Sequence, residues 1–238
     1  MILIMFNLFY LLLQLLLILN WTQQVKADVR SITIQNNCPE TLSVGVLTNG
    51  QPQPDQRFDL PSHGSRTISK PDTWGGRLFG QPQCSGGDGG GPHCGIAGAA
   101  NPATLAEFFF KGNGGKDFYD ISMVDGYNIP ASISPQGVQN GKGYDCGTSS
   151  CKELPSCPPE LAITDATGKV VGCQSSCSKT GDPQHCCKGN YDDPKLCQAD
   201  EHAKSVKKGC PDSYSFAYDD QSSTFTCANP TGYTVSFC

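Results

Sequence analysis

Three acidic residues stand in sequence contexts that could give them chemical roles. Glu107 follows a Thr-Leu-Ala run and precedes three phenylalanines, and Asp120 and Asp125 are five residues apart. A carboxyl group beside aromatic bulk loses contact with water, which raises its pKa and suits it to act as a general acid. A second carboxylate would complete the minimum set for glycoside hydrolysis. The same groups can also hydrogen-bond sugar hydroxyls without any catalysis.

A simpler interpretation of these residues needs no ligand. Asp117, Asp120 and Asp125 can be strand-end and turn residues that are exposed to solvent or paired with Arg77. Asp120 and Asp125 need not share one face of a strand, so a bend near residues 123–125 would be required to bring them together. The residues alone leave both interpretations open.

The elements that would position these carboxylates are short strands. Segments with alternating or β-branched residues occur at 32–34, 42–46, 107–110, 118–124, 224–226 and 233–237. Turn residues such as Asn49-Gly50 and Asp125-Gly126 separate them, and long stretches with helical periodicity are missing. The pattern predicts an all-β fold with a two-sheet β-sandwich core.

Cysteines add a second constraint on the fold. The chain has fourteen of them, and nine lie within residues 146–210. An even number is typical of a secreted protein whose cysteines pair in an oxidising compartment. Residues 146–210 have too little apolar surface for a core of their own, so we expect a lobe of loops and short helices, with each disulfide contributing about 2–4 kcal/mol. The sandwich core would comprise residues 28–145 and 211–238 of one domain, 28–238.

Residues 1–27 are predicted to be a secretory signal peptide. Residues 1–19 are almost continuously apolar, and Val25 and Ala27 fit a cleavage site before Asp28. No Lys or Arg precedes the apolar run, and its length approaches the roughly 20 residues of a membrane span, so an uncleaved anchor is the alternative. Cleavage would give a secreted, extracellular protein with no membrane span.

Charge and histidine spacing exclude several classes of partner. Lys26 is the only charged residue of the predicted signal peptide, so the mature chain has 17 − 1 = 16 basic and 22 acidic residues and a net charge of 16 − 22 = −6. This balance argues against nucleic acid and anionic membranes as partners. The four histidines, at positions 63, 93, 185 and 202, do not form a spaced ligand set. We therefore expect no metal site and no cofactor.

Several motifs together resemble the thaumatin-like family, the pathogenesis-related group that includes the osmotin type. They are residues 32–39, 102–108, 117–128, the adjacent Cys186-Cys187 and residues 210–216, and the resemblance covers essentially all of residues 30–238. It implies a two-sheet β-sandwich, a disulfide-rich lobe and an acidic cleft between them. It also implies seven disulfides that spacing alone does not select: Cys38–Cys238, Cys84–Cys94, Cys146–Cys227, Cys151–Cys210, Cys157–Cys173, Cys177–Cys186 and Cys187–Cys197.

One segment departs from the family pattern. Members usually have eight disulfides, and their signature includes a Thr-Gly-Asp-Cys segment with one further cysteine. Here Cys94 is followed by residues 95–101 without a cysteine, so one of the usual eight disulfides is missing and the loop 80–101 is shorter. Because this loop borders the cleft in the family, the departure bears on ligand selectivity.

The resemblance also implies which residues line the cleft. Relatives use one Arg, one Glu and three Asp, which correspond here to Arg77, Glu107, Asp120, Asp125 and Asp219. Asp220 and Asp212 are the alternatives for the last position. If the cleft is catalytic, Glu107 is the candidate acid, and Asp120 or Asp125 is the candidate nucleophile or base.

Three functions follow as hypotheses. The first is a secreted defence protein that binds β-1,3-glucan or a related wall polysaccharide in the acidic cleft and acts against fungi. The second is a weak endo-β-1,3-glucanase. The third is an inhibitor of a foreign α-amylase or protease, which would more naturally use an exposed loop. In each case we expect a monomer.

Overall fold

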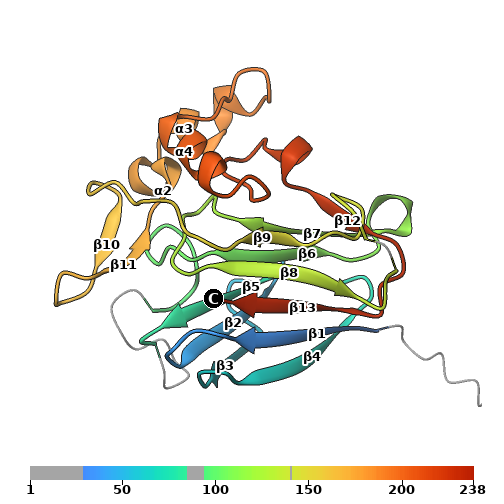
Figure 1. Ribbon diagram of the computed structural model, residues 1–238. Coiled ribbons are helices and arrows are strands. Elements are labelled where there is room, and N and C mark those ends of the chain that lie inside the picture. The colour runs from blue at the N-terminus through green and yellow to red at the C-terminus, as the bar shows by residue number, and fades with distance from the viewer. Residues whose placement is uncertain (1–28, 85–93, 140) are drawn as a thin grey trace, which may run out of the picture.

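Two β-sheets pack face to face, and a lobe of short helices and one hairpin lies against one end of the sandwich (Figure 1). The computed structural model describes residues 29–84, 94–139 and 141–238. The predicted signal peptide, residues 1–27, lies outside the described residues. The predicted all-β sandwich with a disulfide-rich lobe is confirmed.

The first sheet holds both ends of the described chain. Its strand order is β4-β1-β13-β8-β9, in which β1 and β13 run parallel and the other neighbours run antiparallel. These strands are β1 (Val29–Asn36), β4 (Ser65–Pro71), β8 (Ala131–Gln136), β9 (Ser149–Cys151) and β13 (Gly232–Phe237).

The second sheet carries the candidate site. Its order is β12-β7-β6-β5-β2-β3, and all its neighbours are antiparallel. These strands are β2 (Leu42–Thr48), β3 (Gln56–Leu60), β5 (Gly75–Pro82), β6 (Leu105–Phe109), β7 (Asp117–Ser122) and β12 (Phe225–Cys227). A 3-10 turn, η1 (Asn113–Gly115), lies between β6 and β7.

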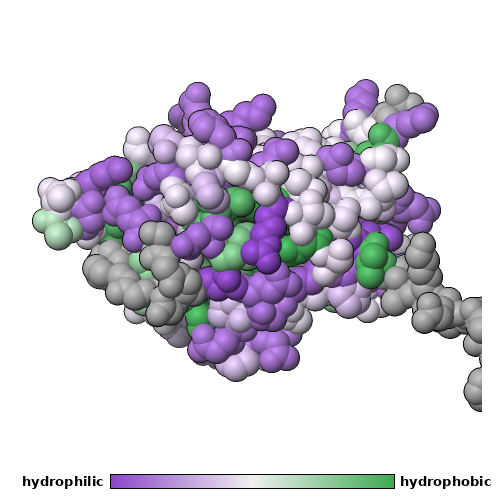
Figure 2. All heavy atoms as spheres, turned by 90° about the horizontal axis from the view of Figure 1, so that it is seen from below, coloured by the Kyte–Doolittle hydropathy of each residue, from purple (hydrophilic) through white to green (hydrophobic). Residues whose placement is uncertain are grey.

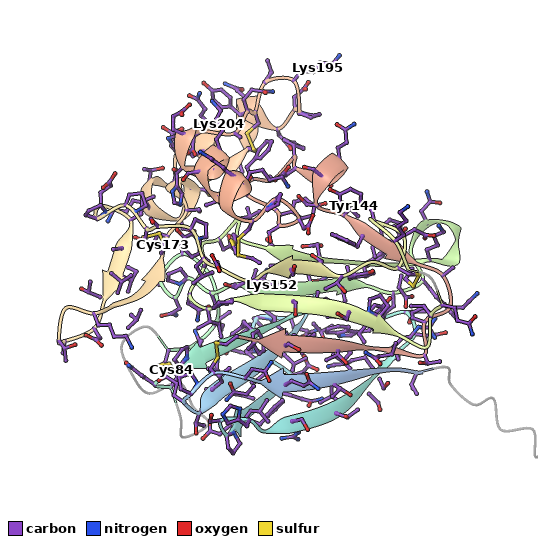
Figure 3. All side chains as sticks on the ribbon, in the orientation of Figure 1. Cys84, Tyr144, Lys152, Cys173, Lys195 and Lys204 are labelled. Atoms are coloured by element: carbon purple, nitrogen blue, oxygen red, sulfur yellow. A yellow bond between two sulfur atoms is a disulfide. The ribbon has the colours of Figure 1, made fainter. Side chains whose placement is uncertain are left out.

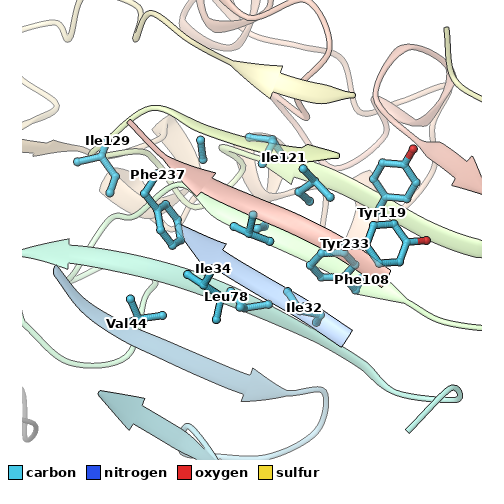
Figure 4. Close-up of a cluster of buried hydrophobic side chains, with 14 of the residues drawn as sticks. Ile32, Ile34, Val44, Leu78, Phe108, Tyr119, Ile121, Ile129, Tyr233 and Phe237 are labelled. Carbon is cyan, nitrogen blue, oxygen red and sulfur yellow. The ribbon is translucent and has the colours of Figure 1, made fainter. Parts of the chain in front are cut away.

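Strand alternation builds the core between the two sheets. In β1, Ile32 and Ile34 are buried, and β13 contributes Tyr233 and Phe237 in the same way. They belong to one cluster with apolar side chains of β2, β5, β6 and β7, as Figure 4 shows. Each buried Å² of apolar surface contributes about 25 cal/mol, so this cluster is the main source of sandwich stability.

Disulfides stabilise the lobe and tie it to the sandwich. The lobe contains the hairpin β10 (Ala162–Thr164) and β11 (Val170–Cys173), the helices α2 (Ser176–Thr180), α3 (Pro183–Cys186) and α4 (Glu201–Gly209), and the 3-10 turn η2 (Gly189–Tyr191). A further 3-10 turn, η3 (Asp220–Ser222), precedes β12. All fourteen cysteines are paired, in the seven disulfides that the resemblance implies (Figure 3).

The start of the lobe differs from the expected boundary at residue 146. Strand β9 falls within the range expected for the lobe, yet Ser149 and Cys151 pair with β8 in the first sheet. The chain leaves the sandwich after Cys151, which is bonded to Cys210.

On the face away from the lobe, hydrophilic side chains predominate and hydrophobic ones occur in small groups (Figure 2).

Candidate functional site

Arg77, Glu107 and Asp120 form a row of side chains across the six-stranded sheet, which we call the acidic row. Arg77 of β5 lies opposite Glu107 of β6, and Glu107 lies opposite Asp120 of β7. Residues directly opposed in antiparallel strands have Cβ atoms about 4.5–5.5 Å apart, so these three side chains are neighbours on one face. The register thus assembles three of the residues that the resemblance assigns to the cleft.

Strand alternation explains why the row faces away from the core. Ala106 and Phe108, on either side of Glu107, are both buried between the sheets, so Glu107 points to the opposite face. Tyr119 and Ile121 fix the direction of Asp120 in the same way. Because Ala106 and Phe108 must be buried in the core, they set the direction of the Glu107 side chain.

Asp125 reaches the same cleft from a tight turn after β7. The Gly126 amide donates to the Met123 carbonyl at 2.9 Å and closes the turn. Gly126 has a φ of +110°, and a Cβ atom there would come within 2.2 Å of the Cys173 carbonyl oxygen. Ser178 of α2 donates its hydroxyl to the Asp125 carbonyl at 2.9 Å. This turn is the bend that the sequence required to bring Asp120 and Asp125 together.

The opposite wall of the cleft comes from the segment after α4. The Tyr214 amide donates to the Ile121 carbonyl at 2.8 Å, and the Met123 amide donates to the Tyr214 carbonyl at 2.9 Å, so Tyr214 runs beside the end of β7. The cleft has a volume of about 370 Å³. Its lining consists of Arg77, Leu105, Glu107, Asp120, Ser122, Val124, Asp125, Tyr214 and Ala217.

Both carboxyl groups of the row have raised pKa values. For Glu107, burial is the largest cause of the raised pKa, which Arg77 opposes and the Asp125 charge increases. Burial, Glu107 and Asp220 together raise the pKa of Asp120 well above its ordinary range. Two neighbouring carboxylates repel each other when both are ionised, so the pair favours holding one proton. An acid and a base side by side are what proton-transfer chemistry requires.

Two buried polar atoms of the row have no hydrogen-bond partner among the described residues. They are Oδ1 of Asp120 and Nε of Arg77. Leaving such a group unsatisfied costs about 1–3 kcal/mol. A hydroxyl group can donate to a carboxylate oxygen and accept from a guanidinium N–H, so a polyhydroxylated ligand is chemically suited to the polar groups of this row.

Asp219 is not among the residues that line the cleft. Its carboxylate accepts hydrogen bonds from the Ser215 amide (3.1 Å) and hydroxyl (2.9 Å), and it lies 3.1 Å from Lys207 Nζ. The aspartate is buried and holds the loop after α4 together. The next residue, Asp220, accepts from the Tyr214 hydroxyl at 2.8 Å and raises the pKa of Asp120, so it is the aspartate of this loop that affects the row.

Asp117 also lies away from the cleft. It is buried, and its Oδ2 accepts from Arg30 Nε at 2.9 Å and from the Tyr233 hydroxyl at 3.0 Å. It is three positions from Asp120, so strand alternation places the two on opposite faces of β7. The pairing with Arg77 that the simpler interpretation allowed for Asp117 is replaced by a pairing with Arg30.

Sequence reasoning missed Tyr214 as part of the cleft. Tyr214 stands within the motif 210–216, but nothing local signals that this segment returns to β7. The Tyr214 hydroxyl donates to Asp220 at 2.8 Å, and burial is the largest cause of its raised pKa. Among the described residues, no group of three His, Cys, Asp or Glu side chains is placed to hold a metal ion.

Comparison with known proteins places the chain in a family. The family model described as the thaumatin family matches residues 36–238. The chain belongs to the thaumatin family. Thaumatin-like protein 1a of Malus domestica is 40% identical to it over 229 residues, which cover 89% of this chain and 91% of that protein.

Two further thaumatin-family relatives differ in the names they carry. Pathogenesis-related protein 5 of Arabidopsis thaliana is 39% identical over 230 residues, covering 91% of this chain and 93% of that protein. A protein of Prunus avium named glucan endo-1,3-beta-glucosidase is 40% identical over 228 residues, covering 89% of this chain and 91% of that protein.

In the described part of this thaumatin-family chain, no helix has the length and apolar character needed to cross a membrane.

Proposed function

We propose that this protein is a secreted defence protein that binds β-1,3-glucan or a related wall polysaccharide in its acidic cleft. The observation that carries the proposal is the register of Arg77, Glu107 and Asp120 across three neighbouring strands at the floor of a cleft of about 370 Å³. Carboxylates accept from sugar hydroxyls and a guanidinium donates to them, so one row can hold several hydroxyls of one ring.

Secretion and a role in defence have their own support. Seven disulfides suit an oxidising compartment outside the cytosol. The relatives include a pathogenesis-related protein that is 39% identical to this chain. The acidic balance of the chain, 17 basic against 22 acidic residues, favours a neutral polysaccharide over an anionic one.

Weak endo-β-1,3-glucanase activity is the second candidate, because both carboxyl groups of the row have raised pKa values. A protonated Glu107 would donate its proton to the glycosidic oxygen. Asp120 or Asp125, on the same cleft, would act as nucleophile or base. The 40% identical relative named glucan endo-1,3-beta-glucosidase supports testing this activity.

Co-sedimentation with insoluble β-1,3-glucan tests the binding. We expect the wild-type protein to sediment with the glucan and a Glu107→Ala/Asp120→Ala double variant to lose at least about tenfold in affinity, or 1.4 kcal/mol. Glu153→Ala is the matched control, because Glu153 is exposed and does not line the cleft. It should sediment like the wild type.

Release of reducing ends in the same tubes separates binding from hydrolysis. Glu107→Gln keeps the shape of the side chain but cannot donate a proton as a carboxylic acid, so it would stop sugar release if the protein is a glucanase. Binding without release from the wild type would leave a lectin-like cleft. A wild-type protein that neither binds nor cleaves the glucan would contradict the proposal and favour the hydrolase-inhibitor hypothesis.

A further inference from the structure

The sheet face that carries the acidic row continues onto two phenylalanines, which lie just outside the lining of the cleft. Along β7, Phe118, Asp120 and Ser122 alternate with buried residues and point to one face in that order. Phe109 of β6 lies opposite Phe118, one pleat repeat beyond Glu107. Two residues of extended strand span about 7 Å, which separates the phenylalanines from the carboxylates. The turn with Asp125 lies at the other end of the row, after Ser122.

Within residues 29–84, 94–139 and 141–238, Phe109 is one of five large hydrophobic side chains that are exposed to solvent. Its exposed fraction is 53%, although both of its neighbours in the sequence are buried. Transfer of a phenylalanine from water into contact with an apolar surface is worth about 1.5–3 kcal/mol, and this residue forgoes much of that gain in the free protein. Ligand-binding grooves commonly combine exposed aromatic side chains with a few polar groups, and Phe109 beside the polar cleft fits this pattern.

Two glycines let the Phe109 ring lie across the strands. Gly75 of β5 lies opposite Phe109, and a Cβ atom at Gly75 would come within 2.9 Å of Phe109 Cδ2. A Cβ atom at Gly112 would come within 2.9 Å of Phe109 Cδ1 and 2.8 Å of Phe118 Cδ2. The two sides of the ring therefore rest on backbone that carries no side chains, and any larger residue at 75 or 112 would push the ring away.

We infer that Phe109, supported by Phe118, is an aromatic subsite that stacks against one sugar ring of a glucan chain whose next two rings occupy the acidic cleft. This inference rests on the proposed function, because it takes a glucan as the occupant of the cleft. The ring hydroxyls of a β-linked glucose are equatorial, which leaves its two faces covered by C–H groups. Such a face buries apolar surface on an aromatic ring while the hydroxyls point sideways to polar partners.

The continuity of the sheet face from the carboxylates to the phenylalanines selects this occupant. One strand step separates the hydrogen-bonding groups of Glu107 and Asp120 from the apolar surface of Phe109. A short oligosaccharide would fill the acidic row alone, and a longer one would reach the phenylalanines. The subsite thus makes the protein selective for chain length.

Titration calorimetry with β-1,3-linked oligosaccharides tests the subsite. We would measure the affinities of the wild type, Phe109→Thr and Phe109→Tyr for a disaccharide and a hexasaccharide. Threonine keeps strand propensity at this position, and tyrosine keeps the aromatic face. The control is Val170→Thr, which removes apolar character at a position with a similar exposed fraction, 50%, on the lobe hairpin.

The inference predicts that Phe109→Thr lowers the affinity for the hexasaccharide by about tenfold and leaves disaccharide affinity unchanged, whereas Phe109→Tyr and Val170→Thr match the wild type. Equal hexasaccharide affinity in the wild type and Phe109→Thr would overturn the aromatic subsite and leave the proposed function standing. So would an equal loss in Phe109→Tyr or in Val170→Thr. A wild-type protein that binds neither oligosaccharide would overturn both.

Discussion

Glu107 and Asp120 lie directly opposite each other on β6 and β7, and burial raises the pKa of each. The Glu107 charge adds to the rise for Asp120. The sheet thus holds two like charges together on a surface where neither can be fully hydrated. This arrangement costs folding stability when both groups are ionised, and a ligand that supplies hydroxyl groups would relieve part of that cost.

The first prediction concerns the pH dependence of stability. Because the pKa of Asp120 is higher in the folded than in the unfolded state, the folded state binds the proton more tightly. The resulting stability is fully present below the unfolded pKa of about 3.9 and is lost as the pH rises through the folded pKa. Asp120→Asn does not titrate, so it should be more stable than the wild type at pH 7, with the difference disappearing near pH 3.

Thermal unfolding of the two proteins at both pH values checks this prediction. Each kcal/mol should shift Tm by about 2–4 °C in a chain of this size. Glu153→Gln, at an exposed site, should show no difference at either pH. A gap between Asp120→Asn and the wild type that is equally large at both pH values would mean that the effect is not due to the ionisation of Asp120.

The second prediction concerns Lys207, which organises the wall of the cleft from α4. Its ammonium group donates to the Ser213 carbonyl at 3.0 Å and the Ser223 hydroxyl at 2.8 Å, and it pairs with Asp219 at 3.1 Å. Lys207→Met would leave the Asp219 carboxylate buried without its cation. Removing one partner of a fully buried pair costs about 3–5 kcal/mol. We expect about 2–3 kcal/mol here, because the Lys207 side chain retains 24% of its exposure.

Lys204→Met on the same helix is the matched control. Lys204 is exposed and pairs with Glu201 at 2.7 Å, three residues earlier. Its removal should cost no more than about 0.5 kcal/mol. Urea unfolding measures both variants, and a Lys207→Met protein as stable as Lys204→Met would contradict this role of the ammonium group.

The third prediction concerns the turn that presents Asp125. Gly126→Ala adds a Cβ atom 2.2 Å from the Cys173 carbonyl oxygen and 2.7 Å from Pro102 Cβ, at a φ of +110°. Gly168→Ala has a similar positive φ of +85° and nothing within 4 Å, so it isolates the backbone strain from the clash. We expect a loss of about 1 kcal/mol for Gly168→Ala and at least about 3 kcal/mol for Gly126→Ala. Equal losses in denaturant unfolding would show that the turn can move away from the lobe.

The fourth prediction separates two disulfides. Cys151–Cys210 closes a loop with a sequence separation of 59 and holds the segment that leads to Tyr214, whereas Cys84–Cys94 closes a separation of 10. Replacing both cysteines by alanine should cost about 4 kcal/mol in the first case and about 3 kcal/mol in the second. Only the first should also weaken binding of the β-1,3-glucan disaccharide, measured by calorimetry below the unfolding temperature. A disaccharide affinity that is unchanged without Cys151–Cys210 would show that Tyr214 is positioned by other contacts.

Much of the fold could be predicted from local features of the sequence. Alternation identified strands such as β7 and β13, and the cysteine distribution identified the lobe. Alternation also separates Asp117 from Asp120, because residues three apart in a strand face opposite ways. The disulfide pairs came from the family resemblance, since spacing alone leaves many pairings open.

The remainder of the site depends on contacts between distant segments. Tyr214 joins the cleft only because its backbone pairs with β7, and Arg30 reaches Asp117 across 87 residues. The choice between Asp219 and Asp220 depends on the backbone of a non-repetitive loop, where no alternation rule gives the direction of a side chain. Asp219 pairs with Lys207, whereas the next residue, Asp220, raises the pKa of Asp120.

Binding in the acidic cleft can be followed by the amide chemical shifts of the labelled protein during titration with a β-1,3-linked hexasaccharide. We expect saturable shifts at Glu107, Asp120 and the turn around Asp125, which line the cleft, and none at the exposed lobe residues Val170 and Leu196. Saturable shifts confined to residues outside the cleft, or no shifts at millimolar sugar, would contradict binding in this cleft.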